Sequence, residues 1–145
     1  MALVEKTVLV AHSAEQMFNL VDRVEHYPEF LPWCGGASVA ELESGKVHAT
    51  VCINYHSIKQ CFTTENLRTP PQQIDMTLQD GPFRQLDGCW RFIPLNDTAC
   101  KIEFRLHYEF SSKLLEKLVG PVFSYIANSF VDAFINRAEK VYSDV

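Results

Sequence analysis

The sequence lacks most of the features that identify a protein's chemistry by inspection. It contains no G-x-S-x-G, H-E-x-x-H, G-x-G-x-x-G or Walker motif, so the local signatures of hydrolases, metalloproteases and nucleotide-binding enzymes are missing. Its 13 Lys and Arg residues are scattered and outnumbered by 18 Asp and Glu residues. This balance disfavours a dedicated nucleic-acid binder, and DNA is not an expected partner.

Long hydrophobic runs are also missing. The longest uncharged run, residues 118–131, is shorter than the roughly 20 apolar residues of a membrane-spanning helix, and Gly120 and Pro121 interrupt it. Near the N-terminus, Glu5 and Lys6 interrupt the apolar stretch and no basic segment precedes it, which argues against a signal or transit peptide. We therefore expect a cytoplasmic protein, with transient contact with the inner membrane surface left open.

Cysteine is present, but not in a pattern typical of a disulfide framework or a zinc site. The five cysteines form an odd set without a C-x-x-C pair. The sequence predicts reduced, structural thiols, with no metal site and no required cofactor.

The composition indicates an ordinary globular chain. Its 145 residues fit a single domain, 1–145, and 47% of them are hydrophobic, enough for a sizeable core.

The spacing of apolar residues along the chain indicates the order of strands and helices. Residues 3–10 predict a strand, and residues 14–21 a short helix capped by Ser13, with Gln16 at the capping-box position.

From about residue 37 to residue 110 the pattern has period two. Turn signals divide it into six strands, and in the last of these Ile102, Phe104 and Leu106 alternate with charged residues. A long amphipathic helix follows, from a cap at Ser111 or Ser112 to about residue 142, with a kink expected at Pro121. The prediction is an α+β fold: a curved, seven-stranded antiparallel sheet wrapped around the C-terminal helix.

No constellation of side chains predicts catalysis. The five histidines fall mostly in turns or on the solvent face of strands, and surface positions are the favoured interpretation. Cys34 and His26 resemble a nucleophile pair only loosely, because a cysteine beside Trp33 is more often a core residue. Aromatic residues on the buried sheet face either line a pocket or fill a core, and the N–H of Trp90 slightly favours a ligand role.

Three motifs resemble a known family. They are DRVEHYPEFLPWC (22–34), DGPFRQLDGCWRF (80–92) and YEFSSKLLEKLVGPVF (108–123), followed by FVDAFINRAEKVY (130–142). The chain resembles the coenzyme Q-binding protein family of the START-like, polyketide cyclase-like superfamily, which includes ribosome association toxins. The resemblance implies a helix-grip fold around an elongated hydrophobic cavity. Residues 27–33 would form a proline-bounded turn that closes one end of the cavity, and Phe83 would point inward from a tight hairpin at Gly81 and Pro82.

The first function implied is non-catalytic binding of ubiquinone or a similar polyprenyl lipid, in support of respiration. The predicted cavity residues are Tyr27, Phe30, Leu31, Trp33, Met76, Leu78, Phe83, Trp90, Phe92, Phe104, Leu106, Phe123, Ile126 and Phe130. Membrane contact through Tyr27, Phe30, Leu31 and Trp33 is conceivable if they face outward, but a core position is favoured.

Two alternatives stay open. A toxin that binds the large ribosomal subunit and hinders subunit association would need an exposed basic patch, with Arg84, Arg91, Lys101 and Arg105 as candidates. A cyclase or aromatase-like enzyme is supported only by analogy of fold. The side chains to test for it are Tyr55, Tyr108 and Arg137.

Overall fold

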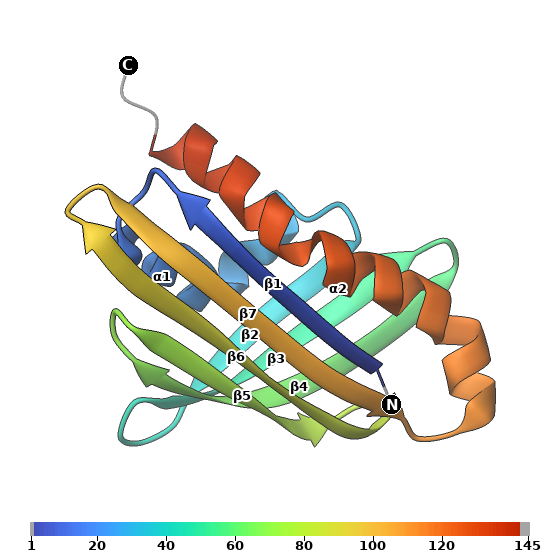
Figure 1. Ribbon diagram of the computed structural model, residues 1–145. Coiled ribbons are helices and arrows are strands. Elements are labelled where there is room, and N and C mark those ends of the chain that lie inside the picture. Colours follow the sequence, from blue (N-terminus) through green and yellow to red (C-terminus); the bar gives the residue numbers. More distant parts are fainter. Residues whose placement is uncertain (1, 143–145) are drawn as a thin grey trace.

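Seven antiparallel strands form one continuous sheet in this computed structural model, which describes residues 2–142 (Figure 1). The strands are β1 (Ala2–Val10), β2 (Cys34–Glu41), β3 (Lys46–Tyr55), β4 (Ile58–Thr69), β5 (Gln73–Asp80), β6 (Phe83–Asn96) and β7 (Ala99–Phe110). Their order across the sheet is β1-β7-β6-β5-β4-β3-β2, so from β2 onward each strand pairs with the next one in the chain. The predicted six-stranded meander is confirmed.

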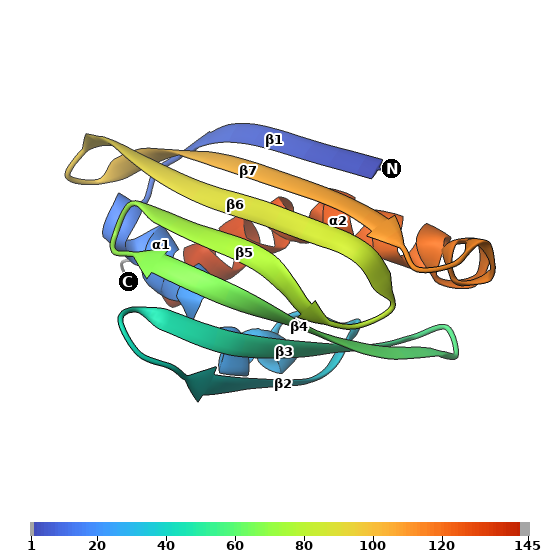
Figure 2. The same ribbon diagram turned by 90° about the horizontal axis from the view of Figure 1, so that it is seen from below.

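The helices all lie on one side of the sheet. They are α1 (Ala14–Asp22), a 3₁₀ helix (Val24–Glu29) and α2 (Lys113–Val141). Figure 2 shows the sheet curving around α2, with α1 beside its C-terminal part. This is the helix-grip arrangement that the sequence predicted.

The alternating pattern of each strand decides which face packs against the helices. In β7, Ile102, Phe104 and Leu106 are buried, whereas Arg105 between the last two is exposed. The buried side chains of the sheet and helices form one continuous hydrophobic core. The outer face of the sheet carries mostly polar and charged residues, together with exposed leucines such as Leu3 and Leu67.

Both helix starts use the caps that the sequence indicated. Ser13 Oγ accepts from the Gln16 backbone N–H at 3.1 Å, and Gln16 Oε1 accepts from the Ser13 N–H at 3.0 Å, which completes a capping box. Ser112 caps α2 by accepting from the Leu115 N–H at 3.1 Å. Pro121 lies inside α2, where its ring removes a helical hydrogen bond, and the first turns of the helix bend away from the rest (Figure 1).

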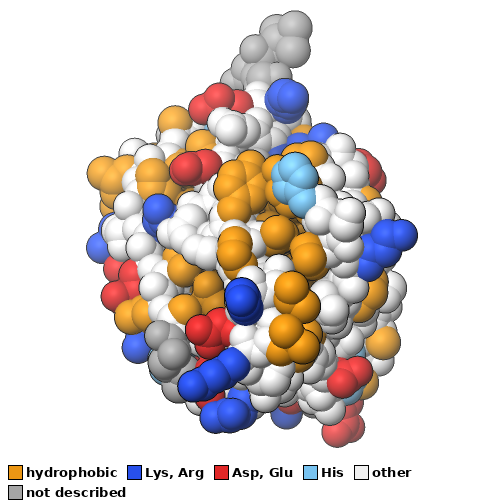
Figure 3. Space-filling model, turned by 90° about the vertical axis from the view of Figure 1, so that its right-hand side faces the viewer, with side chains coloured by type: hydrophobic (Ala, Val, Ile, Leu, Met, Phe, Trp, Pro, Cys, Tyr) orange, Lys and Arg blue, Asp and Glu red, His pale blue; other side chains and the backbone are white. Residues whose placement is uncertain are grey.

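By length and composition α2 could span a membrane, with a mean hydropathy of 1.4 in its most apolar window. Several of its apolar side chains, however, pack inside the protein. Val119, Phe123, Ile126, Val131 and Phe134 are buried against the rest of the protein. One face of α2 therefore belongs to the core, whereas Leu114, Leu118 and Tyr125 of the same helix are exposed, and hydrophobic side chains are visible on the side of the molecule where α2 begins (Figure 3).

The proline-rich stretch after α1 folds as a short helical turn against the core. The 3₁₀ helix contains Pro28, and β2 begins at Cys34. Tyr27, Leu31 and Trp33 are each at most 5% exposed, and Phe30 is half-buried. The predicted core position is confirmed, and these aromatic residues are not presented to a membrane in this conformation.

A tight hairpin joins β5 and β6 at Gly81. This glycine has a φ of 144°, and a Cβ there would approach the Cβ of Phe62 to 2.6 Å. Both the backbone angle and the close neighbouring strand therefore require glycine. The hairpin places Phe83 inside the core, 6% exposed.

The prediction that all five cysteines are reduced is wrong for two of them. Cys52 and Cys61 form a disulfide. They lie directly opposite each other on the antiparallel strands β3 and β4, with Cα atoms 4.0 Å apart. The hairpin that pairs these strands brings together two thiols nine residues apart in the chain. Cys34, Cys89 and Cys100 are free thiols.

Candidate ligand-binding cavity

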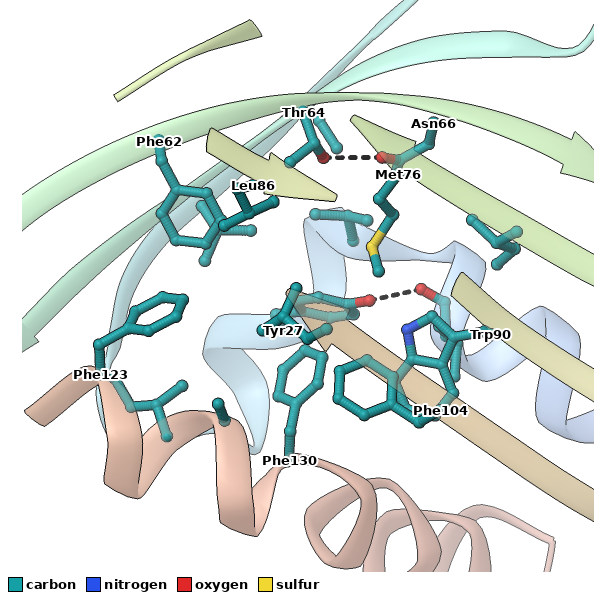
Figure 4. A pocket seen from close by; sticks show the side chains of 18 of the residues that line it. Tyr27, Phe62, Thr64, Asn66, Met76, Leu86, Trp90, Phe104, Phe123 and Phe130 are labelled. Atoms are coloured by element: carbon teal, nitrogen blue, oxygen red, sulfur yellow. Dashed lines mark hydrogen bonds between the residues drawn. The ribbon is translucent and has the colours of Figure 1, made fainter. Parts of the chain in front are cut away.

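An apolar cavity lies between the inner face of the sheet and α2 (Figure 4). Strands β3 to β7 form one wall, α2 forms the opposite wall, and the segment from α1 to Trp33 closes one side. The cavity has a volume of about 70 Å³. Since pockets for drug-sized ligands usually measure roughly 300–1,000 Å³, a large ligand requires movement of α2 or of side chains in the wall.

Nine of the fourteen predicted cavity residues lie in this wall. They are Tyr27, Trp33, Met76, Trp90, Phe104, Leu106, Phe123, Ile126 and Phe130. They come from six separate elements or connecting segments, so the curvature of the sheet brings together residues up to a hundred positions apart in the chain. Figure 4 shows Trp90, Phe104 and Phe130 close together on one side of this space, with Phe62 and Phe123 on the other.

The other five predicted residues lie outside the wall. Phe92 packs edge-on against Phe18 of α1, with ring centroids 5.9 Å apart, and so fills the core below that helix. Phe30 packs against Phe134, and Phe83 stacks on Phe110 at the far end of the sheet. Leu31 is fully buried and Leu78 is half-buried, but neither borders the cavity.

Ten wall residues were not predicted. They are Val21, Val24, Ala49, Val51, Phe62, Thr64, Asn66, Ile74, Leu86 and Ala127. Most of them are apolar strand residues that alternate with outward-facing residues, so the sequence pattern could have predicted them. Thr64 and Asn66 were not, because polar side chains in a strand are normally assigned to the solvent face.

Five wall residues carry polar groups: Tyr27, Trp33, Thr64, Asn66 and Trp90. The Tyr27 hydroxyl donates to the backbone carbonyl of Val21, and Thr64 Oγ1 donates to Asn66 Oδ1 at 2.7 Å. Within residues 2–142, the amide nitrogen of Asn66 and the indole nitrogens of Trp33 and Trp90 have no hydrogen-bond partner, and none of these three atoms is completely inaccessible. All five residues are less than 10% exposed.

The cavity wall has no charged side chain among the described residues that form it. Burial raises the pKa of Tyr27 far above its usual value, so its hydroxyl stays neutral and acts only as a hydrogen-bonding group. Nor does any group of three or more His, Cys, Asp or Glu side chains within residues 2–142 form a metal site. The cavity is chemically suited to hold an apolar molecule.

The predicted basic residues lie on the opposite, outer face of the sheet, where three of the four have acidic partners. Arg84 pairs with Glu109 at 3.0 Å, while Arg91 and Lys101 both lie near Glu103, at 3.3 and 3.6 Å. Arg105 is exposed and has no ion pair within the described part of the chain. These acidic partners reduce the basic character of this face.

The three side chains proposed for a cyclase do not meet at the cavity. Arg137 pairs with Glu29 at 3.1 Å on the surface of α2, and Tyr55 stacks on Tyr125 with centroids 5.9 Å apart. Tyr108 is buried outside the cavity wall.

A curved antiparallel sheet that holds a long C-terminal helix over an apolar cavity defines a START-like protein. Residues 10–135 match the family described as polyketide cyclase / dehydrase and lipid transport, and the chain belongs to this family.

Relatives of the chain carry different names. The ribosome association toxin RatA of Vibrio cholerae is 46% identical over 144 residues, which cover 99% of this chain and 100% of the toxin. The mitochondrial coenzyme Q-binding protein COQ10 homolog B of Xenopus laevis is 29% identical, over 92% of this chain and 57% of that protein. The predicted resemblance is confirmed at the level of family.

A solved structure shares the fold. The Zhui aromatase/cyclase from Streptomyces sp. R1128 superposes with a TM-score of 0.77 over 96% of this chain and 94% of that one, at 18% identity. At this identity the similarity extends to the fold alone.

Proposed function

We propose that this protein is a non-catalytic carrier or receptor for a hydrophobic polyprenyl lipid such as ubiquinone. One observation carries the proposal: an apolar, uncharged cavity lies beneath α2, walled by side chains from five strands and a helix. A cytoplasmic protein with transient contact with the inner membrane is consistent with this role, which would support respiration. The name of the COQ10 relative is in line with the same ligand class.

Binding of such a lipid would be driven by burial of its tail. Each buried CH₂ group contributes about 0.8 kcal/mol, so each added isoprene unit strengthens binding as long as it is enclosed. Opening a cavity of about 70 Å³ to admit the ligand opposes this gain. We therefore expect affinity to rise steeply with the first isoprene units and then level off.

The two tryptophans of the chain make this directly measurable. Trp33 and Trp90 both line the cavity and together supply all of the tryptophan fluorescence. A benzoquinone bound between them is expected to quench it with a stoichiometry of one. Titration with quinones of zero to four isoprene units tests the dependence on the tail. Absence of saturable quenching with every tail length would contradict lipid binding.

A variant that fills the cavity provides the matched test. Ala127 faces the cavity from α2 and is 2% exposed, whereas its neighbour Asn128 is exposed. Ala127→Leu should weaken quinone binding at least tenfold by occupying the space of the ligand. Asn128→Leu makes a similar change on the outside of the same helix and should leave binding unchanged. Equal affinity in the two variants would place the ligand elsewhere.

A second candidate function is association with the large ribosomal subunit, so that pairing with the small subunit is hindered. The 46% identity to RatA over nearly the whole chain supports it. The outer face of the sheet is the surface to test, because Arg105 is exposed there without an acidic partner within residues 2–142.

This second function predicts a loss of 70S ribosomes when the protein is overproduced. Sucrose gradients at low magnesium should show a smaller 70S peak and larger subunit peaks. Arg105→Glu should restore the 70S peak, while Lys46→Glu, with the same charge change at the start of β3, should not. An unchanged 70S peak with the wild-type protein would exclude this function.

A further inference from the structure

The inner face of β4 places two polar side chains inside an otherwise apolar core. Thr64 and Asn66 are 6% and 7% exposed, and within residues 2–142 they are the only buried residues that are polar or charged. Burial of a hydroxyl or an amide costs free energy unless its hydrogen bonds are made. A purely structural core would ordinarily use apolar residues at both positions.

The hydrogen bonds of this pair are only half complete. The Thr64 hydroxyl donates to Asn66 Oδ1 at 2.7 Å, which fixes the orientation of the amide. The two N–H groups on Asn66 Nδ2 have no partner among the described residues, although both side chains border the cavity. Figure 4 shows the Thr64–Asn66 bond on the sheet side of the cavity, across the space from Tyr27 and Phe130.

The hydrogen-bond donors that remain unused in the wall are all N–H groups. Thr64 and Tyr27 use their donors within the protein, whereas Asn66 Nδ2 and the indole Nε1 atoms of Trp33 and Trp90 do not. The acceptor lone pairs left in the wall belong to oxygens that already take part in one hydrogen bond, whereas an amide N–H and an indole N–H can only donate. A ligand that offers an acceptor, such as a carbonyl oxygen, satisfies them, whereas a pure hydrocarbon leaves them unpaired.

We propose that Asn66, oriented by Thr64, anchors a carbonyl oxygen of the hydrophobic ligand, so that the cavity prefers a quinone or similar ketone to a hydrocarbon of the same shape. The inference rests on the proposed lipid-binding function and adds the chemistry of the head group. Asn66 is a binding residue, and Thr64 is a positioning residue that acts through it.

The test compares two probes with the same tail. Decylbenzoquinone carries two carbonyl groups, and decylbenzene carries none. Calorimetric titration of the wild-type protein and of Asn66→Leu with each probe separates the anchor from the cavity. Asn66→Leu should lower the affinity for decylbenzoquinone about tenfold, because the carbonyl oxygen of this ligand is then buried without a hydrogen bond. The affinity for decylbenzene should change by less than twofold.

Two further variants define the role of each residue. Thr64→Val frees the amide of Asn66 to rotate and should lower the affinity for decylbenzoquinone by a smaller factor than Asn66→Leu does. Thr63→Val is the matched control, because Thr63 makes a similar hydroxyl bond, 2.7 Å from Thr50, on the outer face of the same strand. It should change neither affinity.

A measurement on the wild-type protein covers the case in which Asn66→Leu does not fold. The side-chain ¹⁵N–¹H resonances of Asn66 should shift on addition of decylbenzoquinone and change much less with decylbenzene. Equal shifts with both probes, or equal losses of both affinities in Asn66→Leu, would overturn the anchor and leave the lipid-binding function standing. If the wild-type protein binds neither probe, the proposed function fails and the anchor with it.

Discussion

Two phenylalanines one turn apart on α2 allow the stability of the core and the size of the cavity to be tested separately. Phe130 borders the cavity and Phe134 does not. Their rings pack edge to face with centroids 5.0 Å apart, and each also lies within 6 Å of the Trp90 ring. Phe134 is 0% exposed, whereas Phe130 is half-buried. Truncation of either to alanine therefore removes similar ring contacts, but only Phe130→Ala directly enlarges the cavity.

The expected losses of stability follow from burial. Replacement of a fully buried Phe by Ala costs about 3–5 kcal/mol. Phe134→Ala should fall in this range, and Phe130→Ala should lose less, about 2–3 kcal/mol, because part of its ring is already accessible. For a chain of this size each kcal/mol lowers the Tm by about 3–4 °C, so calorimetry should find both variants folded but with a Tm lower by roughly 6 to 20 °C.

Ligand binding then distinguishes the two sites. Phe130→Ala should admit a bulkier or longer tail, with a larger gain in Tm on saturation with quinone than the wild type shows. Phe134→Ala should bind with nearly wild-type affinity once the protein is folded. The reasoning is refuted if the two variants change tail selectivity equally, or if Phe130→Ala costs more stability than Phe134→Ala.

Three further predictions concern single groups. Tyr27→Phe removes the hydroxyl that donates to the buried Val21 carbonyl and should cost about 1–3 kcal/mol in urea unfolding; a loss below about 0.3 kcal/mol would show that this bond does not matter. Ser13→Ala breaks the capping box of α1 and should cost about 1 kcal/mol by the same assay, with no change as the contrary result. Burial raises the pKa of the Cys89 thiol to about 12 and of the Cys100 thiol to about 11, so both are protonated at pH 8. Their alkylation by iodoacetamide should be far slower than that of glutathione and should rise about tenfold from pH 8 to pH 9, whereas a plateau would contradict the raised pKa values.

Much of the fold was predictable because the strands are half-buried. In β7 the apolar side chains alternate with charged ones, so the sequence itself indicates which face is inside. Ser13 and Gln16 stand at the spacing of a capping box, a local signal that needs no tertiary information. The order of elements followed from these two kinds of pattern.

The disulfide was missed although a signal was present. Cys52 and Cys61 are symmetric about the turn at His56 and Ser57, so the antiparallel hairpin places them opposite each other. Counting cysteines and searching for C-x-x-C ignores this relation, because it depends on strand register. Pairing the predicted strands before judging the cysteines would have found it.

The polar pair in the cavity and the pairing of the basic residues could not be predicted in the same way. Thr64 and Asn66 are polar but face inward, so the rule that places polar strand residues on the solvent face is wrong for them. Arg91 and Glu103 are twelve residues apart but directly opposite in the β6–β7 register, where they form an ion pair. Local charge in the sequence therefore overstates the basic surface.

The most direct test of the account is native mass spectrometry of the protein purified gently from a quinone-producing host, with organic extraction of any bound molecule. Lipid binding in the cavity predicts a one-to-one adduct whose extracted mass is that of a polyprenyl quinone, and this adduct should be lost in Ala127→Leu but kept in Asn128→Leu. The bare mass of the chain alone, even after incubation with excess quinone, would contradict the central claim.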